Sequence, residues 1–459
     1  MMRKRLFLLL YTILSTTATW AQRFDSCLLD TAVYNQVPLA APLMRGDYQN
    51  LPTSHSLKKF AATPKDQGDL GTCVGWATAY MARTIMLAQK EHWQGASYIT
   101  EKALSPFFVY ENIKAYDDRT CLQGATLYAA FESLKNTGTV QYAQFAKSCN
   151  QAVTSTLREK AQAYRIQDYK RLFPTSTKDK VSYVKKSIAE DKPVVIGVKC
   201  CVNSFLNVEG AVWNISPEDD FSALSATGGH AVTVVGYDDE KYGGAFEIMN
   251  SWGTAWGNEG FLWVRFKDFN DFCFEAYEMV EKDDFSNKLA GEVQLKLSAG
   301  HTMPLQLKSG MYEATQAYRS GTLFRLYVAN FQPAYVYIFS TDLTRKNFAI
   351  FPYSDHISPY LGYRRNRLAL PSEQHYIEMD ETKGLDYYCI LYAKEKLHLP
   401  SILEALTFTE GNFKERLQKV IGMKLVKTQE QQLVTDTIRF TAPTTEGTVI
   451  PIIIAIPHQ

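Results

Sequence analysis

The order of two hydrophobic patterns along the chain constrains its fold more than any other feature. Between residues 51 and 138, apolar residues recur at helical spacing, and the longest run is VGWATAYMARTIMLAQ at 74–89. From residue 192 onward, short runs rich in β-branched and aromatic residues alternate with glycine and aspartate. Helices followed by strands predict an α+β fold. We expect helices at 74–89, 105–114 and 124–138, and strands at 192–200, 230–239, 244–252 and 260–266.

The second half of the chain is mostly β in pattern. A charged and polar stretch, EKDDFSNKLAGE at 281–292, predicts a linker. Beyond it come short aromatic-rich runs separated by turn residues, such as GTLFRLYVANF at 321–331, and they predict a β-sandwich domain over 290–459. We also expect a helix within 401–425 and a last strand at 448–457.

The N-terminus has the layout of a cleaved secretory signal. Basic residues at 3–5 precede an apolar stretch at 6–14, and Thr19 and Ala21 suit a signal-peptidase site. The apolar stretch is shorter than the roughly 18 to 20 residues of a spanning helix, which disfavours a membrane anchor. We therefore predict a signal peptide at 1–21 and a secreted, periplasmic or cell-surface protein.

The segment that follows, 22–50, is polar, contains prolines and shows no sustained helical period. We interpret it as a short lead and a candidate propeptide. The formal net charge of the whole chain is +1, which gives no electrostatic attraction toward nucleic acid or acidic membranes. Partners must therefore be inferred from a specific site.

Export places the cysteines in an oxidising environment, where disulfides are allowed. An even number of cysteines is compatible with full pairing, and equally with one reserved thiol and an unpaired companion, because spacing does not fix connectivity. No CxxC pair and no zinc-type spacing occurs, so we expect no structural metal. The eight cysteines are Cys27, Cys73, Cys121, Cys149, Cys200, Cys201, Cys273 and Cys389.

Cys73 lies where a thiol can become a nucleophile. Within KDQGDLGTCVGWATAY, glycines precede it and an apolar helix follows, so the dipole of the helix N-terminus favours a thiolate. His230, at the start of a predicted strand, supplies an imidazole, and Asn250 on the next strand supplies an acceptor that orients it. Gln67 offers a side-chain amide for the oxyanion that forms when a thiolate attacks a carbonyl.

Three motifs in this order, DQGDLGTCVGWA, GGHAVTVVGYD and MNSWGTAWGNEGF, resemble those of the papain family of cysteine peptidases. The resemblance implies a two-lobed catalytic domain at 51–284, with a helical left lobe and a β-barrel-like right lobe. It implies Cys73 as nucleophile, His230 as general acid and base, and Asn250 as the residue that orients His230. It further implies Gln67 as the oxyanion-hole donor.

The resemblance also points to residues of the substrate cleft. CLQGATLYAA is similar to the family segment beside the cleft, which makes Gly124 a candidate for backbone pairing with an extended peptide; the alternative is a simple turn before a helix. Gly229 allows close approach of a backbone or substrate, and Trp252 would shield the hydrogen bond between His230 and Asn250.

The sequence departs from the family pattern near the nucleophile. The family usually has a cysteine three residues before it and a tryptophan directly after it, where this chain has Leu70 and Val74. Leu70 removes a disulfide partner, and the thiol itself is unaffected. Cys121 and Cys149 correspond to family positions that form disulfides, though not necessarily with each other. Cys200 and Cys201 cannot readily bridge to one another, so one of them either pairs with Cys273 or stays a buried small hydrophobe.

The C-terminal half contains SGTLFRLYVANFQPAYVYIFSTDL and FPYSDHISPYLGYRRNRLALP, which resemble a bacterial domain of unknown function that is appended to exported peptidases. The resemblance implies a bacterial secreted protein with a binding or stabilising C-terminal module. YRRNR at 363–367 is either a basic and aromatic contact patch for a polysaccharide, an acidic surface or a protein partner, or a solvated loop.

These residues together predict a secreted cysteine endopeptidase that acts through a thioester intermediate and needs no metal or organic cofactor. The predicted partner is a peptide or protein substrate, without nucleic acid and without stable membrane insertion. Two alternatives stay open. One is a thiol acyltransferase or transpeptidase, in which an amine intercepts the thioester, and the other is a papain-like peptide-binding protein without catalysis.

Overall fold

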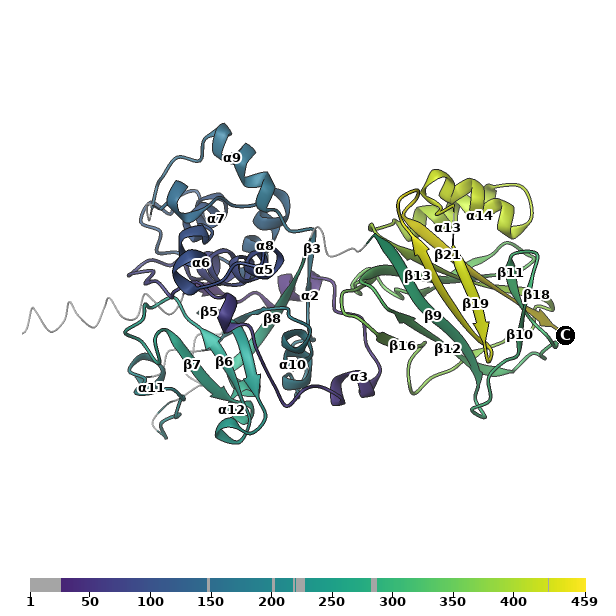
Figure 1. The fold of residues 1–459 in the computed structure, drawn as a ribbon, viewed down its shortest axis with the longest axis horizontal. Helices are drawn as coiled ribbons and strands as arrows, with labels where there is room; N and C mark the ends of the chain where they lie inside the picture. The colour runs from purple at the N-terminus through teal and green to yellow at the C-terminus, as the bar shows by residue number, and fades with distance from the viewer. Residues whose placement is uncertain are drawn as a thin grey trace, which may run out of the picture. The chain divides into compact units, whose positions relative to one another are not determined.

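The computed structural model describes residues 26–146, 149–199, 203–217, 219, 228–281, 287–427 and 429–459 (Figure 1). The predicted signal peptide and the pair Cys200 and Cys201 lie outside these residues. The chain forms two compact units. The first comprises residues up to Val37 together with Leu51–Lys282, and the second comprises Pro38–Asn50 together with Asp283–Gln459. A search of the described helices found no segment with the length and apolar character that crossing a bilayer requires.

A long buried helix organises the first unit. It runs without a break through α4 (Cys73–Gly75), the π-type segment η2 (Trp76–Arg83) and α5 (Thr84–Lys90), as the apolar pattern predicts. Helix α7 (Pro106–Ile113) crosses α4 so closely that a Cβ on Gly75 would lie 2.4 Å from the carbonyl oxygen of Pro106. Hydroxyl groups of Ser105 and Thr126 cap α7 and α8 (Leu127–Asn136), which explains where these helices begin.

An antiparallel sheet forms the other part of the first unit, opposite the helices α5 to α8 in Figure 1. Each strand is buried on at least one face, which agrees with its β-branched and aromatic composition. The strand order is β3 (Asp168–Arg171), β8 (Cys273–Val280), β4 (Val194–Val198), β5 (Gly228–Asp238), β6 (Ala245–Met249) and β7 (Phe261–Arg265). Two short strands, β1 (Cys27–Leu28) and β2 (Ser54–Ser56), also pair with β5. The α+β prediction is therefore confirmed.

Shorter elements connect these parts of the first unit. They are α2 (Thr31–Gln36), η1 (Lys58–Phe60), α6 (Ala96–Lys102), η3 (Tyr142–Gln144), α9 (Ser155–Ala161), η4 (Gln162–Tyr164), α10 (Val181–Ala189), α11 (Asn203–Leu206), η5 (Lys241–Gly243) and α12 (Phe266–Phe272).

The second unit is a sandwich of two sheets that share one apolar core. Its first sheet has the order β10 (Leu305–Lys308), β11 (Met311–Ala314), β21 (Val449–His458), β18 (Gly384–Ala393), β13 (Ala334–Thr341) and β14 (Asn347–Phe351), with β15 (Tyr360–Leu361) beside β13. Its second sheet has the order β16 (Asn366–Leu370), β12 (Leu323–Asn330), β9 (Lys288–Leu297), β20 (Thr437–Pro443) and β19 (Glu430–Val434), with β17 (Ile377–Glu378) beside β12.

Three sequence predictions need correction. The linker predicted over 281–292 ends earlier, because β9 begins at Lys288. The single helix predicted within 401–425 is divided into α13 (Leu399–Phe408), α14 (Phe413–Ile421) and the short η6 (Gly422–Lys424), because Asn412 and Glu415 form a capping box that starts a new helix. The lead at 22–50 contains helices α2 and α3 (Arg45–Gln49), and its residues are divided between the two units.

The YRRNR stretch also exposes fewer side chains than its sequence indicates. Tyr363 and Asn366 are buried, and Arg367 forms an ion pair with Asp47 of the same unit at 2.8 Å. Arg364 and Arg365 are exposed.

Candidate active site

Cys73 lies at the first turn of the long helix and is fully buried. Its Sγ lies 3.2 Å from Oγ of Ser26, a residue of the lead. Burial raises the pKa of the Cys73 thiol to about 11, while Ser26 and backbone N–H groups, including that of Ala231, oppose the rise. The thiol is therefore neutral in this closed arrangement, although it lies at a helix N-terminus.

His230 and Asn250 lie on neighbouring strands and contact each other. His230 is the first residue of β5 that pairs with β4, and Asn250 follows β6. The distance from Nε2 of His230 to Oδ1 of Asn250 is 2.7 Å. Burial lowers the pKa of His230 to about 4, and the hydrogen bond to Asn250 opposes this only in part. Nδ1 of His230 is buried and has no hydrogen-bond partner among the described residues. Asn250 thus holds Nε2 of His230 in place, and Nδ1 is available for a proton or a hydrogen bond.

The ring of Trp252 stacks on that of His230, with centroids 4.7 Å apart and an interplanar angle of 30°. Trp252 is itself 7% exposed and packs against Phe205 and Trp256. An aromatic cluster therefore covers the histidine from one side, where the sequence places Trp252.

Gln67 is held by Ser251, a residue that the sequence analysis did not select. Oγ of Ser251 donates to Oε1 of Gln67 at 2.5 Å, and the backbone N–H of Gln67 donates to the carbonyl of Ser251 at 2.8 Å. Nε2 of Gln67 uses one hydrogen on the carbonyl of Leu70, at 2.7 Å. The position of Ser251 inside the NSWG motif is the signal that could have identified it.

Residues 26–28 of the lead lie in a groove beside Cys73. Cys27 and Leu28 pair antiparallel with Gly229 and Gly228 of β5. On the other side, the N–H of Leu28 donates to the carbonyl of Ala125 at 3.0 Å, and the N–H of Ala125 donates to the carbonyl of Ser26 at 3.1 Å. An extended backbone therefore fits between these two walls.

The structure places Gly124 at this groove, but the pairing itself occurs one residue later, at Ala125. Gly124 has a φ of 75°, and a Cβ there would lie 2.2 Å from the carbonyl oxygen of Ser26. A side chain at this position would exclude the segment, so the glycine provides the space for a close backbone approach.

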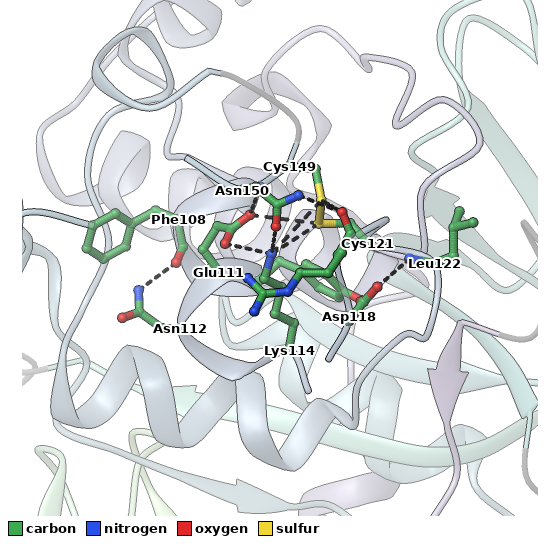
Figure 2. A network of polar contacts seen from close by, with 11 residues as sticks. Phe108, Glu111, Asn112, Lys114, Asp118, Cys121, Leu122, Cys149 and Asn150 are labelled. Atoms are coloured by element: carbon green, nitrogen blue, oxygen red, sulfur yellow. Dashed lines mark hydrogen bonds and ion pairs between the residues drawn. A yellow bond between two sulfur atoms is a disulfide. The ribbon is translucent and has the colours of Figure 1, made fainter. Parts of the chain in front are cut away.

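Two further residues that the sequence analysis missed support this wall of the groove. The buried hydroxyl of Tyr110 accepts a hydrogen bond from the N–H of Gly124 at 3.0 Å and donates to Asp118 at 2.7 Å. Asp118 in turn accepts from the N–H of Leu122 at 3.1 Å (Figure 2). Neither residue belongs to a recognisable motif, so only the folded chain reveals their role.

A disulfide joins Cys121 to Cys149, and Figure 2 shows it above a polar network. Nζ of Lys114 lies 2.9 Å from Oε2 of Glu111 and 2.7 Å from Oδ1 of Asn150. The sequence left open whether Cys121 and Cys149 pair with each other, and the structure shows that they do. Because the carbonyl of Cys121 accepts the N–H of Gly71 at 2.7 Å, the cross-linked loop also contacts the loop that precedes the nucleophile.

The remaining described cysteines carry free thiols. Cys27, Cys273 and Cys389 are buried, and burial raises the pKa of each of them. Cys273 is thus a free, buried thiol, and Cys200 and Cys201 lie outside the described residues. One group of metal-binding residue types, Glu111 with Cys121 and Cys149, occurs in the described part of the chain, but the disulfide removes both thiolates.

Residues 54–282, about half of the chain, match the sequence model of the papain family cysteine proteases. The chain carries a papain-family cysteine protease domain. A cysteine protease from Blomia tropicalis is 26% identical over 240 residues, which cover 50% of this chain and 66% of that protein. Cathepsin J from Mus musculus is 28% identical over 217 residues, which cover 46% of this chain and 58% of that protein. The chain thus spans less than two thirds of the length of these curated relatives.

Among solved structures, xylellain, a cysteine protease from Xylella fastidiosa, is 20% identical and has a TM-score of 0.46. The similar region covers 56% of this chain and 97% of xylellain. The papain-family match ends at residue 282, where the first compact unit of this chain also ends.

Proposed function

We propose that this protein is an exported cysteine endopeptidase in which Cys73 is the nucleophile and His230 the general acid and base. The observation that carries the proposal is the short contact between His230 of β5 and Asn250, because β5 packs against the helix α4 that bears Cys73. The papain-family match over residues 54–282 supports the same assignment.

In the proposed reaction, His230 accepts the proton of Cys73, and the thiolate sulfur attacks the carbonyl carbon of a peptide bond. The N–H of Cys73 and the remaining hydrogen of Nε2 of Gln67 then stabilise the oxyanion. As the C–N bond breaks, His230 protonates the leaving amine and a thioester remains. Water, deprotonated by His230, hydrolyses the thioester, which releases the acid and restores the thiol. Asn250 keeps the imidazole in the required orientation throughout.

The lead supports a proposal of latency. Ser26, Cys27 and Leu28 fill the groove that a substrate needs, and both reacting groups are completely buried beneath them. Burial keeps Cys73 and His230 neutral, because it raises the pKa of the thiol and lowers that of the imidazole. We therefore propose that residues 26–28 must leave the groove before the ion pair forms and substrate binds.

Export rests on the N-terminal sequence, and the disulfide between Cys121 and Cys149 is compatible with it. We propose that the second unit is a binding or stabilising module. Its exposed residues Arg364 and Arg365 are candidates for contact with an acidic surface.

The test uses the full chain and a variant that empties the groove. Ser26 is fully buried against Cys73, so Ser26→Trp should displace residues 26–28. We expect this variant to label with iodoacetamide at Cys73 near pH 5 and to hydrolyse a denatured protein substrate. Both properties should be lost when His230→Ala is added, and should persist when Cys389→Ser, which removes a buried thiol of the second unit, is added instead.

The alternatives give other results. Mass analysis of the products in the presence of added amines would show amide products in place of free acids if the protein is an acyltransferase. Failure of Ser26→Trp to label or to hydrolyse peptide bonds, in a chain with native circular dichroism, would refute the endopeptidase and favour a peptide-binding protein.

A further inference from the structure

The second sheet of the sandwich turns a polar face away from the apolar core. On β9, Glu292, Gln294 and Lys296 are half-buried, whereas the residues between them belong to the core. Within the sheet, Glu292 pairs with Ala329 of β12 on one side and with Arg439 of β20 on the other. A cavity of about 250 Å³ lies over this face, where the short side chain of Ala329 leaves space among longer neighbours.

A larger cavity of about 630 Å³ adjoins the first, and its lining includes Phe331, Arg364 and Arg365. Glu292 and Arg439 line both cavities, so the two form one groove, which we call the second-sheet groove. All of its lining residues belong to the second unit. Its size suits a small ligand or a short stretch of a polymer.

A buried asparagine fixes the turn that carries the two neighbouring arginines of the groove. Asn330, the last residue of β12, is fully buried, and its Nδ2 donates to the carbonyls of Leu361 and Tyr363 at 3.1 and 2.8 Å. The carbonyl of Asn330 accepts the N–H of Arg365 at 2.8 Å. Arg365 has a φ of 61°, which is unfavourable for a residue with a side chain and persists because these bonds hold the turn. The backbone of both arginines is therefore ordered before any ligand binds.

Cations outnumber carboxylates along the second-sheet groove. Among the described residues that line it, Glu292 is the one acidic residue, and it lies 3.2 Å from Nε of Arg439. Arg367 pairs with Asp47 at 2.8 Å. The excess of positive charge favours an anionic ligand. The lining cations are Lys296, Arg364, Arg365, Arg367 and Arg439.

The other groups of the groove indicate which kind of anion fits. The carboxylate of Glu292 accepts hydrogen bonds, and a phosphodiester backbone has no donor for it, whereas a sugar has hydroxyl groups. Gln294 and Thr437 add an amide and a hydroxyl that can also bond to sugar hydroxyls. Tyr327 and Phe331 add aromatic rings against which the C–H faces of a sugar can pack.

We propose that the second-sheet groove binds an acidic polysaccharide whose sugar units carry carboxylate groups. The proposal rests on the proposed role of the second unit as a binding module and names the ligand of that module. Arg364 and Arg365 bind the carboxylates through their forked N–H groups. Glu292 and Gln294 bond to the sugar hydroxyls, and Phe331 packs against a sugar ring. The second unit thereby holds the protein on a carboxylated glycan.

The experiment measures binding of a short oligomer of galacturonic acid to the unaltered full-length chain by titration calorimetry. The methyl ester of the same oligomer keeps the sugar rings and removes the charge, and we expect it to bind about 30-fold more weakly. Arg365→Gln should lower the affinity for the acidic oligomer about 10-fold, because a charge-assisted pair of hydrogen bonds is lost. Polyglutamate, single-stranded DNA and vesicles of an anionic phospholipid should each bind more weakly than the acidic oligomer.

The matched control is Arg345→Gln. Arg345 is another arginine of the second unit with a positive φ, and it pairs with Glu410 outside the groove. The affinity should be unchanged in this variant, and an equal loss in both variants would overturn the assignment of the groove. Tighter binding of polyglutamate, DNA or vesicles would overturn the ligand class and leave a binding module of another kind. If none of these ligands binds, the binding module fails together with its ligand. The endopeptidase proposal is tested separately through Ser26→Trp.

Discussion

At the scale of single residues, Gln67 is the proposed oxyanion donor, and Ser251 holds its side-chain amide in place through the hydrogen bond to Oε1. Ser251→Ala removes the hydrogen bond to Oε1 of Gln67, so the amide can rotate. We expect kcat to fall about 10-fold with KM nearly unchanged, because loss of an oxyanion-hole donor itself costs about 100-fold or more. Steady-state kinetics in the Ser26→Trp background measure both parameters. Ser251→Thr, which keeps a hydroxyl, should retain most of the activity, and an equal loss in both variants would contradict the positioning role.

Glu275, which is buried on β8, should also make folding stability depend on pH. Its pKa is about 8 in the folded chain, above the ordinary value of about 4.3 of an unfolded chain. The folded state therefore binds the extra proton between these values, and the stability that this proton gives is full below about pH 4 and is lost as pH rises through 8. We expect Glu275→Gln to reduce the loss of stability between pH 5 and 8, at about 1.4 kcal/mol for each unit of pKa shift removed. Denaturant unfolding at both pH values measures it, and parallel curves for both chains would contradict the raised pKa.

At the scale of elements, we propose that the strand β1 controls the two proposed reacting groups, Cys73 and His230. In the unaltered chain the pKa of Cys73 is raised to about 11, so the thiolate fraction and the labelling rate should rise about tenfold for each pH unit between 6 and 10. Opening the groove with Ser26→Trp hydrates Cys73 and His230 and permits their ion pair. We expect labelling of this variant to be fast and nearly flat from pH 5 to 8. The measurement is the rate of iodoacetamide labelling of Cys73 at each pH, from reactions quenched at successive times and analysed by peptide mass. An equally steep dependence of this rate on pH in both chains would contradict the proposal that β1 covers the thiol.

The same scale shows what the sequence could and could not predict. Helical and strand periodicities locate α5, α8, β5 and β21 because these elements bury one or both faces. The ordered motifs likewise bring Cys73, His230 and Asn250 to candidate positions. The pairing of Cys27 with Gly229 joins strands that are far apart in the chain, and its backbone hydrogen bonds leave no side-chain pattern. The burial of Glu275 is equally invisible in the sequence, because it depends on every element that packs around this residue.

At the scale of the whole molecule, each unit has a separate core, so damage to one core should leave the other intact. Leu326→Ala and Leu134→Ala remove the same atoms from fully buried sites, the first in the sandwich and the second in the protease unit. Each should destabilise its own unit by about 3 kcal/mol. We expect calorimetry of the full chain to show two transitions, with Leu326→Ala lowering only one and Leu134→Ala only the other. Iodoacetamide labelling of Cys73 in the Ser26→Trp background should be unchanged by Leu326→Ala at 25 °C. A common shift of both transitions would instead show that the two cores unfold as one cooperative unit.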